Sequence, residues 1–513
     1  MRKIILLFVF QGILLIAKAQ GINDAKSKDS ASAIVKEGKS GSLDIVFKPE
    51  EKVITTHSVT IRGKQIPYTA TAGTLPVWNN EGKCIAGLFY AYYERSDVAN
   101  RSARPLVFFF NGGPGSSSAW MHIGYAGPKI LNIDADGYPV YPAGVKENPY
   151  SVLDVADIVF VDPVNTGYSR SVINDAGGNE FFNVQSDIRY LSSWIGHFLT
   201  RNSRWASPVF LVGESYGTTR VSGIAAELQK SEWIYVSGVV LVSPTELGIE
   251  RKGPVQEALK MPYFTAAAWY HSKLSPALQH KDLEEVLAES EKFTTDELLP
   301  AIVRGASLTG ENRKRIAEKM SRYSGMASTV ILQNNLDISS EFFWKELLRD
   351  RGYTIGRLDS RYLGIDKKDA GESVDYNAEL STWYHAFTPP INMYLRDELQ
   401  YKTDLQYVVL KGIGFQGSSA GIADNLRLAM AQDPSLKVMI QSGYYDGACD
   451  YFNAKYSMWQ IDPGGKFKDR FSFKGYRSGH MVYLRKEDLI AASEDLRSFI
   501  LSSVPKAGVS IKY

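Results

Sequence analysis

Five short apolar runs predict the buried strands of a parallel sheet. Each run lacks polar side chains and is followed within three residues by Gly or Pro: 106–110, 158–161, 209–212, 239–242 and 438–440. Such runs are typical of strands that are covered on both faces of a sheet. Helical patterns lie between them, for example over 187–200 and 218–230. This alternation predicts an α/β fold with a mostly parallel central sheet flanked by helices.

Before these runs, apolar and polar residues alternate. Val53, Val59 and Ile61 mark one such stretch, and 85–93 marks another. This pattern is typical of antiparallel strands. We place them at the start of the first part of the core, over 51–245.

Residues 243–437 separate the fourth run from the fifth, which is too long for a single crossover connection. Much of this stretch is charged and helical in pattern, for example over 281–291 and 311–322. We therefore predict a large, mainly helical cap insertion over 246–400. The second part of the core then occupies 401–513.

The N-terminal residues have the three parts of a secretory signal peptide. A positively charged start precedes an apolar stretch over 4–16, interrupted only by Gln11, and small residues at the end predict cleavage after Ala19. A membrane anchor is the alternative, but this stretch is shorter than the roughly 20 residues that a membrane span needs. We predict a signal peptide over 1–19, a flexible segment over 20–50, and a mature protein that is secreted or periplasmic and has no membrane span.

Composition limits the function classes. The formal charge of +2 gives no field that would attract nucleic acid or an anionic membrane surface. A hydrophobic content of 44% excludes a mostly disordered chain. Cys84 and Cys449 allow one bridge, but we expect both to be free, because a core of this size does not need a disulfide. The sequence has no metal-binding Cys/His spacing, so no metal and no cofactor are predicted.

The sequence over 213–217 is G-E-S-Y-G and follows the third apolar run. A G-x-S-x-G sequence between a strand and a helix is typical of a nucleophile elbow, a sharp turn that exposes the serine at the C-terminal edge of the sheet. It also places the Tyr216 N–H at a helix N-terminus, where it can donate to an oxyanion. We predict Ser215 as the nucleophile; a helix start with a buried serine is the alternative.

A serine nucleophile needs a base, and α/β-hydrolases place the acid and then the histidine after the serine. Asp446 follows the fifth apolar run, and His480 is the last histidine, with room for one more strand between them. We predict a Ser215–His480–Asp446 triad. A turn aspartate and a surface histidine are the alternatives, and His385, within the predicted cap, is the other candidate base.

The sequence over 111–115 is N-G-G-P-G and follows the first apolar run, where the second oxyanion donor is expected. Glycine lets a backbone N–H approach the substrate without a side chain in the way. A Gly/Pro turn without this role is the alternative.

Four motifs together resemble the serine carboxypeptidase family. They are N-G-G-P-G-S-S over 111–117, G-E-S-Y-G over 213–217, Asp446 with Cys449 three residues later, and G-H-M-V over 479–482. Their order along most of the chain is far more specific than any one of them. The resemblance implies an α/β-hydrolase fold with a helical cap and the removal of C-terminal residues from peptides. The signal peptide and the few cysteines favour a bacterial member.

The resemblance also implies a role for each matching residue. Ser215, Asp446 and His480 match the family's triad, and the amides of Gly113 and Tyr216 match its oxyanion hole. The other matches bind the substrate's C-terminal carboxylate or line the pocket beyond the scissile bond: Asn111, Gly112 and Glu214 for the carboxylate, and Cys449 and Met481 for the pocket.

The chain also departs from the family pattern. Ser116 stands where Cys is usual and Tyr483 where Pro is usual, and two cysteines cannot form the disulfides of eukaryotic members. Tyr125 stands where the family often has a Glu that pairs with Glu214. We expect Tyr125 to donate to the substrate's carboxylate, so that recognition rests on one carboxyl. Alternatively, Tyr125 only packs, and an acid of the cap has this role.

The main functional hypothesis is a secreted serine carboxypeptidase that acts on peptides through an acyl-enzyme intermediate. An acyltransferase or esterase with the same triad is the alternative, because an acyl-enzyme passes its acyl group to whichever nucleophile is present. A non-catalytic binding protein on a hydrolase scaffold is the third hypothesis. We expect aromatic residues of the cap, such as Trp344 and Trp383, to influence which substrates are accepted. The side-chain preference, the natural substrate and the oligomeric state stay open.

Overall fold

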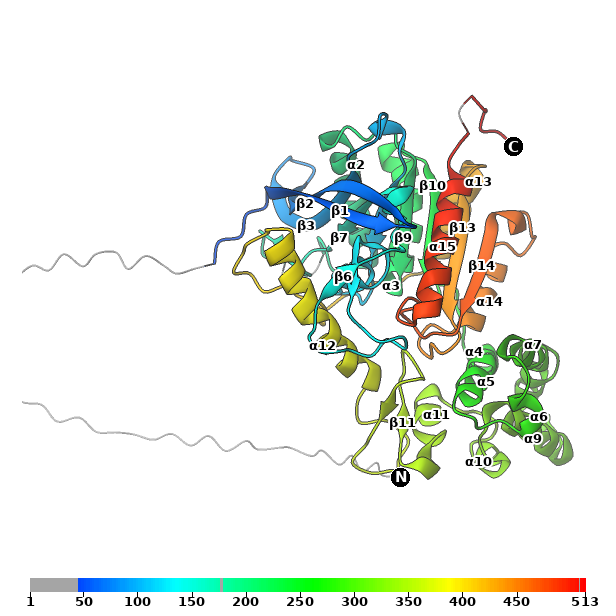
Figure 1. Cartoon of the computed structure of the whole chain (residues 1–513). Helices are drawn as coiled ribbons and strands as arrows, with labels where there is room; N and C mark the ends of the chain where they lie inside the picture. The colour runs from blue at the N-terminus through cyan, green and yellow to red at the C-terminus, as the bar shows by residue number, and fades with distance from the viewer. Residues whose placement is uncertain (1–44, 176–178, 507) are drawn as a thin grey trace, which may run out of the picture. The chain divides into compact units, whose positions relative to one another are not determined.

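The computed structural model describes residues 45–175, 179–506 and 508–513 (Figure 1). The predicted signal peptide and most of the predicted flexible segment lie outside these residues. Within them, no helix is both long and apolar enough to cross a membrane.

The centre of the fold is a ten-stranded sheet. Its strands are β1 (Glu51–Ile61), β2 (Lys64–Trp78), β3 (Cys84–Arg95), β4 (Leu106–Phe110), β7 (Asp157–Val161), β8 (Arg170–Ser171), β9 (Val209–Glu214), β10 (Val236–Val242), β13 (Lys437–Gly443) and β14 (Phe471–Tyr476). They follow the order β1-β2-β3-β7-β4-β9-β10-β13-β14, and β8 pairs with β3. Pairing is antiparallel from β1 to β7 and parallel from β7 to β14. The predicted mainly parallel sheet is therefore confirmed.

The five apolar runs form β4, β7, β9, β10 and β13, whose residues are almost all buried. The strand expected between Asp446 and His480 is β14. Since parallel strands end at the same edge of a sheet, the loops after β4, β9, β13 and β14 meet there.

Helices cover both faces of the sheet (Figure 1). On one face lie α2 (Val184–Arg201), α3 (Tyr216–Glu227), α13 (Ile422–Gln432) and α14 (Tyr451–Ile461), and on the other α1 (Ala119–Met121), α12 (Ala378–Met393) and α15 (Lys486–Ser503). A separate two-stranded sheet pairs β5 (Lys129–Leu131) with β6 (Val145–Glu147). The sheet is thus enclosed between two apolar layers, as its strands require.

The chain between β10 and α13 contains the large, mainly helical insertion. Its elements before α12 are α4 (Pro254–Leu259), α5 (Met261–Tyr270), α6 (Pro276–Gln279), α7 (Leu283–Phe293), α8 (Leu299–Arg304), α9 (Gly310–Ser324), α10 (Ser328–Gln333), α11 (Ser340–Glu346), β11 (Thr354–Ile355) and β12 (Leu363–Gly364). They share an apolar cluster of their own, which includes Phe264, Val286 and Met320. α12 differs, because Trp383 joins a cluster of the sheet. The limits at 246 and 400 stay a prediction.

Candidate active site

Ser215 lies in a sharp turn between β9 and α3. Its backbone angles, φ 59° and ψ −128°, are strained for a residue with a side chain. Two glycines make the turn possible: a Cβ at Gly213 would lie 2.2 Å from the Gly217 carbonyl oxygen, and one at Gly217 would lie 2.3 Å from that of Phe110. The Ser215 N–H donates to the Val242 carbonyl at 3.0 Å. This geometry supports Ser215 as a nucleophile at the C-terminal edge of the sheet.

The predicted acid and base contact each other. His480 follows β14, and its Nδ1 lies 2.7 Å from Oδ2 of Asp446, which follows β13. The other Asp446 oxygen accepts from the N–H groups of Ala448 and Cys449 at 2.9 and 3.0 Å. Burial lowers the pKa of His480, but the charge of Asp446 and its hydrogen bond outweigh burial, so this pKa lies above its ordinary value. With Nδ1 on Asp446, Nε2 is the nitrogen available to a serine.

Ser215 and His480 line one cavity of about 620 Å³. Six other predicted site residues lie in its wall: Gly112, Gly113, Glu214, Tyr216, Cys449 and Met481. Asn111 and Asp446 lie behind the wall, bonded to Glu214 and His480. His385 is an exposed residue of α12 outside this wall, which favours His480 as the base.

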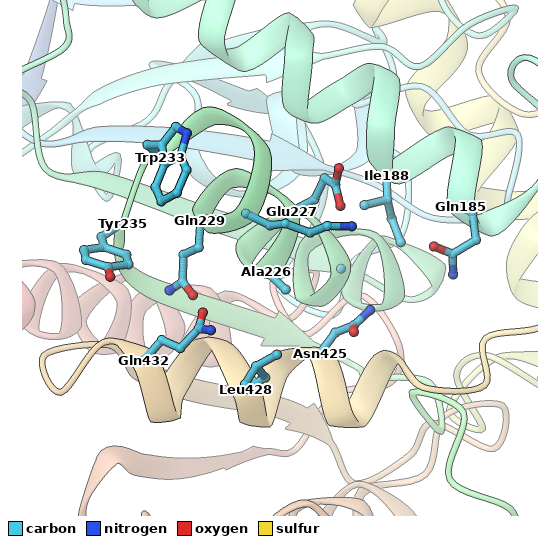
Figure 2. Close-up of a pocket in the computed structure, with 12 residues that line it drawn as sticks. Gln185, Ile188, Ala226, Glu227, Gln229, Trp233, Tyr235, Asn425, Leu428 and Gln432 are labelled. Atoms are coloured by element: carbon cyan, nitrogen blue, oxygen red, sulfur yellow. The ribbon is translucent and has the colours of Figure 1, made fainter.

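A larger hollow of about 710 Å³ lies elsewhere. It is bounded by α2, α3, α13 and the helical turn η4 (Leu228–Glu232), and Gln229, Trp233 and Leu428 line it (Figure 2). The predicted catalytic and binding residues are not among its lining residues. Size alone therefore does not identify the site, whereas the chemistry of the smaller cavity does.

The loop after β4 packs directly against the elbow. A Cβ at Gly112 would lie 2.5 Å from the Tyr216 nitrogen. Gly113 has a φ of 105°, which a residue with a side chain rarely adopts. Glycine is thus required at both positions. Gly113 and Tyr216 both line the cavity that holds Ser215. Their role as oxyanion donors stays a prediction.

Buried ionic side chains that the sequence analysis missed hold this loop. Arg220, in α3, donates to the Asn111 carbonyl at 2.5 Å and to Asp187, in α2, at 2.8 Å. Asp162, at the end of β7, accepts from the N–H and the hydroxyl of Ser118, both at 2.7 Å. The place of Asp162 at the end of a strand was predictable, because Asp162 directly follows the apolar run 158–161. No pattern marked Arg220 and Asp187 as partners.

Glu214 is buried beside the base. The Asn111 amide donates to Glu214 Oε1 at 2.8 Å and accepts from the Met121 N–H at 3.2 Å, which sets its orientation. Glu214 Oε2 has no hydrogen-bond partner among the described residues. Burial raises the pKa of Glu214 to about 7, although the charge of His480 and the donors of Tyr483 and Asn111 oppose the rise. Glu214 therefore carries a proton at pH values below about 7.

The phenol beside Glu214 belongs to Tyr483 and not to Tyr125. The Tyr125 hydroxyl lies 3.0 Å from Gln441 Oε1 and 2.9 Å from the Ala492 carbonyl, to which it donates. The two tyrosine rings stack with centroids 5.0 Å apart. The buried Tyr483 hydroxyl makes no well-formed hydrogen bond within the described chain, but it lies near enough to Glu214 to lower its pKa. The expected contact of Tyr125 with the substrate is corrected accordingly: Tyr125 packs behind Tyr483.

A loop of the insertion lies between the acid and base loops, and we call its residues, 356–361, the bridging loop. The His480 N–H donates to the Leu358 carbonyl at 2.7 Å, and the Gly447 N–H donates to the Arg357 carbonyl at 2.9 Å. Arg357 and Leu358 also line the cavity. The insertion thus contacts both the loop that carries Asp446 and the loop that carries His480.

Buried side chains fix the bridging loop. Glu379, in α12, accepts from the Leu358 N–H at 2.9 Å. The Tyr263 hydroxyl lies 2.7 Å from Ser360 Oγ, and the Trp344 indole donates to that hydroxyl at 2.8 Å. No sequence pattern indicated these contacts, because they join residues from separate helices.

The two tryptophans expected to influence substrate choice do not reach the cavity. Trp344 and Trp383 are buried and absent from its wall. The insertion residues in the wall, apart from Glu246, are Arg357, Leu358, Leu380 and Tyr384.

Ligand atoms of Asp446, Cys449 and His480 lie within 4.8 Å of one another, as in a metal site. Both Asp446 oxygens already have partners, however. Burial raises the pKa of Cys449 well above its ordinary value, which disfavours the thiolate that a metal would need. We therefore interpret Asp446 and His480 as the acid and base of the predicted triad, with Cys449 beside them. Cys84 and Cys449 are both free, as expected.

Curated proteins with similar sequences carry serine carboxypeptidase names. Serine carboxypeptidase-like 36 of Arabidopsis thaliana is 28% identical over 166 residues, or 31% of this chain and 32% of that protein. Retinoid-inducible serine carboxypeptidase of Homo sapiens is 30% identical over 145 residues, or 28% of this chain and 29% of that protein. The chain thus spans about a third of the length of the curated relatives it matches.

The solved structure of a prohormone-processing carboxypeptidase from Saccharomyces cerevisiae has the same fold. It aligns with a TM-score of 0.50 and 14% identity over 84% of this chain and 91% of that chain. The similarity confirms the predicted α/β-hydrolase fold. The family described as serine carboxypeptidase matches residues 62–474, most of the chain. The chain therefore belongs to the serine carboxypeptidase family.

Proposed function

We propose that this protein is a secreted serine carboxypeptidase that releases C-terminal residues from peptides. The observation that carries the proposal is one cavity that holds two arrangements side by side. Ser215 and the His480–Asp446 pair supply acyl-transfer chemistry, and the Asn111–Glu214 pair supplies a buried donor for a carboxylate.

In the proposed reaction, Ser215 Oγ attacks the carbonyl carbon of the last peptide bond while His480 Nε2 takes the hydroxyl proton. Asp446 stabilises the imidazolium. The C–N bond then breaks, and the imidazolium gives this proton to the leaving amine, which departs as the C-terminal residue. A water molecule, deprotonated by His480, attacks the ester, and the proton returns to Ser215. In both halves, the amides of Gly113 and Tyr216 stabilise the oxyanion.

Glu214 explains a preference for a free C-terminus. Below pH about 7 it is protonated and donates a hydrogen bond to the substrate carboxylate; above this pH it is ionised and repels it. An ionised Glu214 also raises the pKa of His480. A protonated Glu214 therefore keeps His480 neutral, and active as a base, to lower pH. Both effects favour peptidase activity on the acid side of neutrality.

Mass spectrometry of a peptide library after incubation with the enzyme tests the proposal. We expect stepwise loss of residues from the C-terminus. Internal cuts, or turnover of esters without any peptide cleavage, would contradict it. Competing amines or alcohols would reveal an acyltransferase, and a lack of labelling by a fluorophosphonate would indicate a binding protein. N-terminal sequencing of the exported protein should begin at Gln20.

A further inference from the structure

A small polar recess opens beside the catalytic cavity. It measures about 160 Å³ and shares Thr245, Glu246, Ala448 and Cys449 with the cavity wall. This volume holds about five water-sized groups, and a Glu or Gln side chain has as many non-hydrogen atoms. A peptide with its scissile carbonyl at Ser215 can therefore direct a neighbouring side chain past Cys449 into the recess.

Arg251 lies in the wall of this recess with an unused donor. Its side chain is only 9% exposed, and its buried Nη1 has no hydrogen-bond partner in the part of the chain that the structure describes. Its Nη2 lies 3.3 Å from Oε1 of Glu246, whose side chain is 60% exposed. A buried guanidinium with an unpaired N–H is unfavourable unless a ligand supplies the acceptor.

The other charged groups around the recess already have partners. Asp450 accepts from the backbone N–H of Asn453 at 2.9 Å and from its side-chain amide, and burial raises the pKa of Asp450 to about 6. Lys260 pairs with Glu257 at 2.6 Å. Glu246, which also lines the recess, is mostly exposed and reaches only Nη2 of Arg251, at 3.3 Å. Arg251 therefore keeps Nη1 as a donor for an anion in this wall.

We propose that Arg251 binds an acidic side chain of the peptide substrate, so that the enzyme prefers Glu or Asp beside the scissile bond. A guanidinium donates two parallel N–H groups to a carboxylate, and such charged pairs are stronger than neutral hydrogen bonds. A Gln side chain of the same size offers only one oxygen and leaves one N–H unpaired. This specificity rests on the proposed carboxypeptidase function and deepens it.

The test compares kcat/KM for blocked dipeptides that carry Glu or Gln on either side of the scissile bond, at pH 6. Wild type should prefer Glu by about tenfold at one of the two positions. Arg251→Met should abolish this preference and retain turnover of the Gln substrate, whereas Arg251→Lys should retain part of it. Lys252→Met is the matched control, because this neighbouring side chain is 81% exposed, and it should behave like wild type.

Equal values for Glu and Gln in wild type overturn the proposal, and so does a preference that survives in Arg251→Met. Equal losses on all substrates, together with a lower melting temperature, would make Arg251 a structural residue. If Arg251→Met lost only the discrimination against C-terminal amides, Arg251 would instead be a ligand of the substrate's terminal carboxylate. If Arg251→Met does not fold, the test rests on Arg251→Lys: a Glu preference equal to that of wild type would overturn the proposal.

Failure of the proposed peptidase function would look different. Wild type would shorten none of the peptides, and a fluorophosphonate would not label Ser215.

Discussion

The loops at the ends of the parallel strands and the bridging loop of the insertion build one cavity in different ways. Ser215 and Asp446 follow the buried strands β9 and β13, and His480 follows the half-buried edge strand β14, so the sheet sets their positions. The bridging loop lies between the two-residue strands β11 and β12, and side-chain hydrogen bonds hold it. It nevertheless binds the backbone of His480. These three side chains thus depend on the strands for their placement, and we expect the insertion to set their final alignment.

The largest effect should come from the strand-end loops. Ser215→Ala removes the proposed nucleophile and should lower kcat for peptides about 10⁴- to 10⁶-fold. The melting temperature should stay almost unchanged, because the hydroxyl adds little to packing. Steady-state kinetics with a thermal melt checks both values.

His385→Ala is the control for this prediction. His385 is exposed on α12 and lies outside the cavity wall, so the variant should retain most activity. Near-wild-type turnover by Ser215→Ala, or a comparable loss in His385→Ala, would refute the triad.

The second effect tests the bridging loop. Glu379→Ala removes the acceptor of the Leu358 N–H and loosens the carbonyl that binds the His480 N–H. We expect kcat to fall about 10- to 100-fold with little change in KM, because small displacements of a catalytic group are costly while substrate contacts remain. Kinetics on one peptide and one small ester measures this split.

Glu379→Gln is the matched variant, because it retains an oxygen acceptor and should restore most of kcat. If Glu379→Ala changed KM for large substrates and spared kcat, the insertion would act only in substrate selection. That result would mean that the strand-end loops alone align the proposed catalytic groups.

The two regions also differ in how far their sequence reveals them. Ser215 was predictable because it lies in a G-x-S-x-G sequence that directly follows an apolar run. Asp446 and His480 were predictable from the chain order expected after such a serine, Asp446 a few residues past the fifth run and His480 as the last histidine. The fold and the presence of the insertion followed from the same runs. Glu379, Leu358 and the other contacts of the bridging loop were not predictable, because they depend on how separate helices pack. Tyr483 was noticed only as an unusual residue, and counting along the chain assigned its place beside Glu214 to Tyr125.

A smaller effect tests the second attachment of the bridging loop. Trp344→Phe removes the indole donor to Tyr263, and one hydrogen bond contributes about 1 kcal/mol. We expect kcat to fall less than about tenfold. Because Trp344 does not line the cavity, the loss should be the same for substrates with large and small side chains. If the ratio of kcat/KM for large and small substrates changed instead, Trp344 would influence substrate selection after all.

The smallest effect concerns the strand-end loop that carries Tyr483. Its hydroxyl lowers the pKa of Glu214, which burial holds at about 7. Tyr483→Phe removes this influence, so the pKa of Glu214 should rise. In the proposed mechanism, the preference for a peptide over its C-terminal amide requires protonated Glu214. It should therefore persist to higher pH in this variant, with a midpoint shift of about one pH unit or less. The measurement is kcat/KM for a blocked dipeptide and its amide from pH 5 to 9.

Tyr125→Phe is the control for this shift, because the Tyr125 hydroxyl donates to the Ala492 carbonyl and lies beside Gln441, away from Glu214. This variant should lose about 1 kcal/mol of unfolding free energy and keep the wild-type midpoint. A midpoint that moves in Tyr125→Phe and not in Tyr483→Phe would place the functional phenol at residue 125 after all. A preference that does not change across this pH range in any variant would show that Glu214 does not bind the carboxylate in its protonated form. Recognition would then depend on a backbone donor such as the Gly112 N–H, which does not titrate.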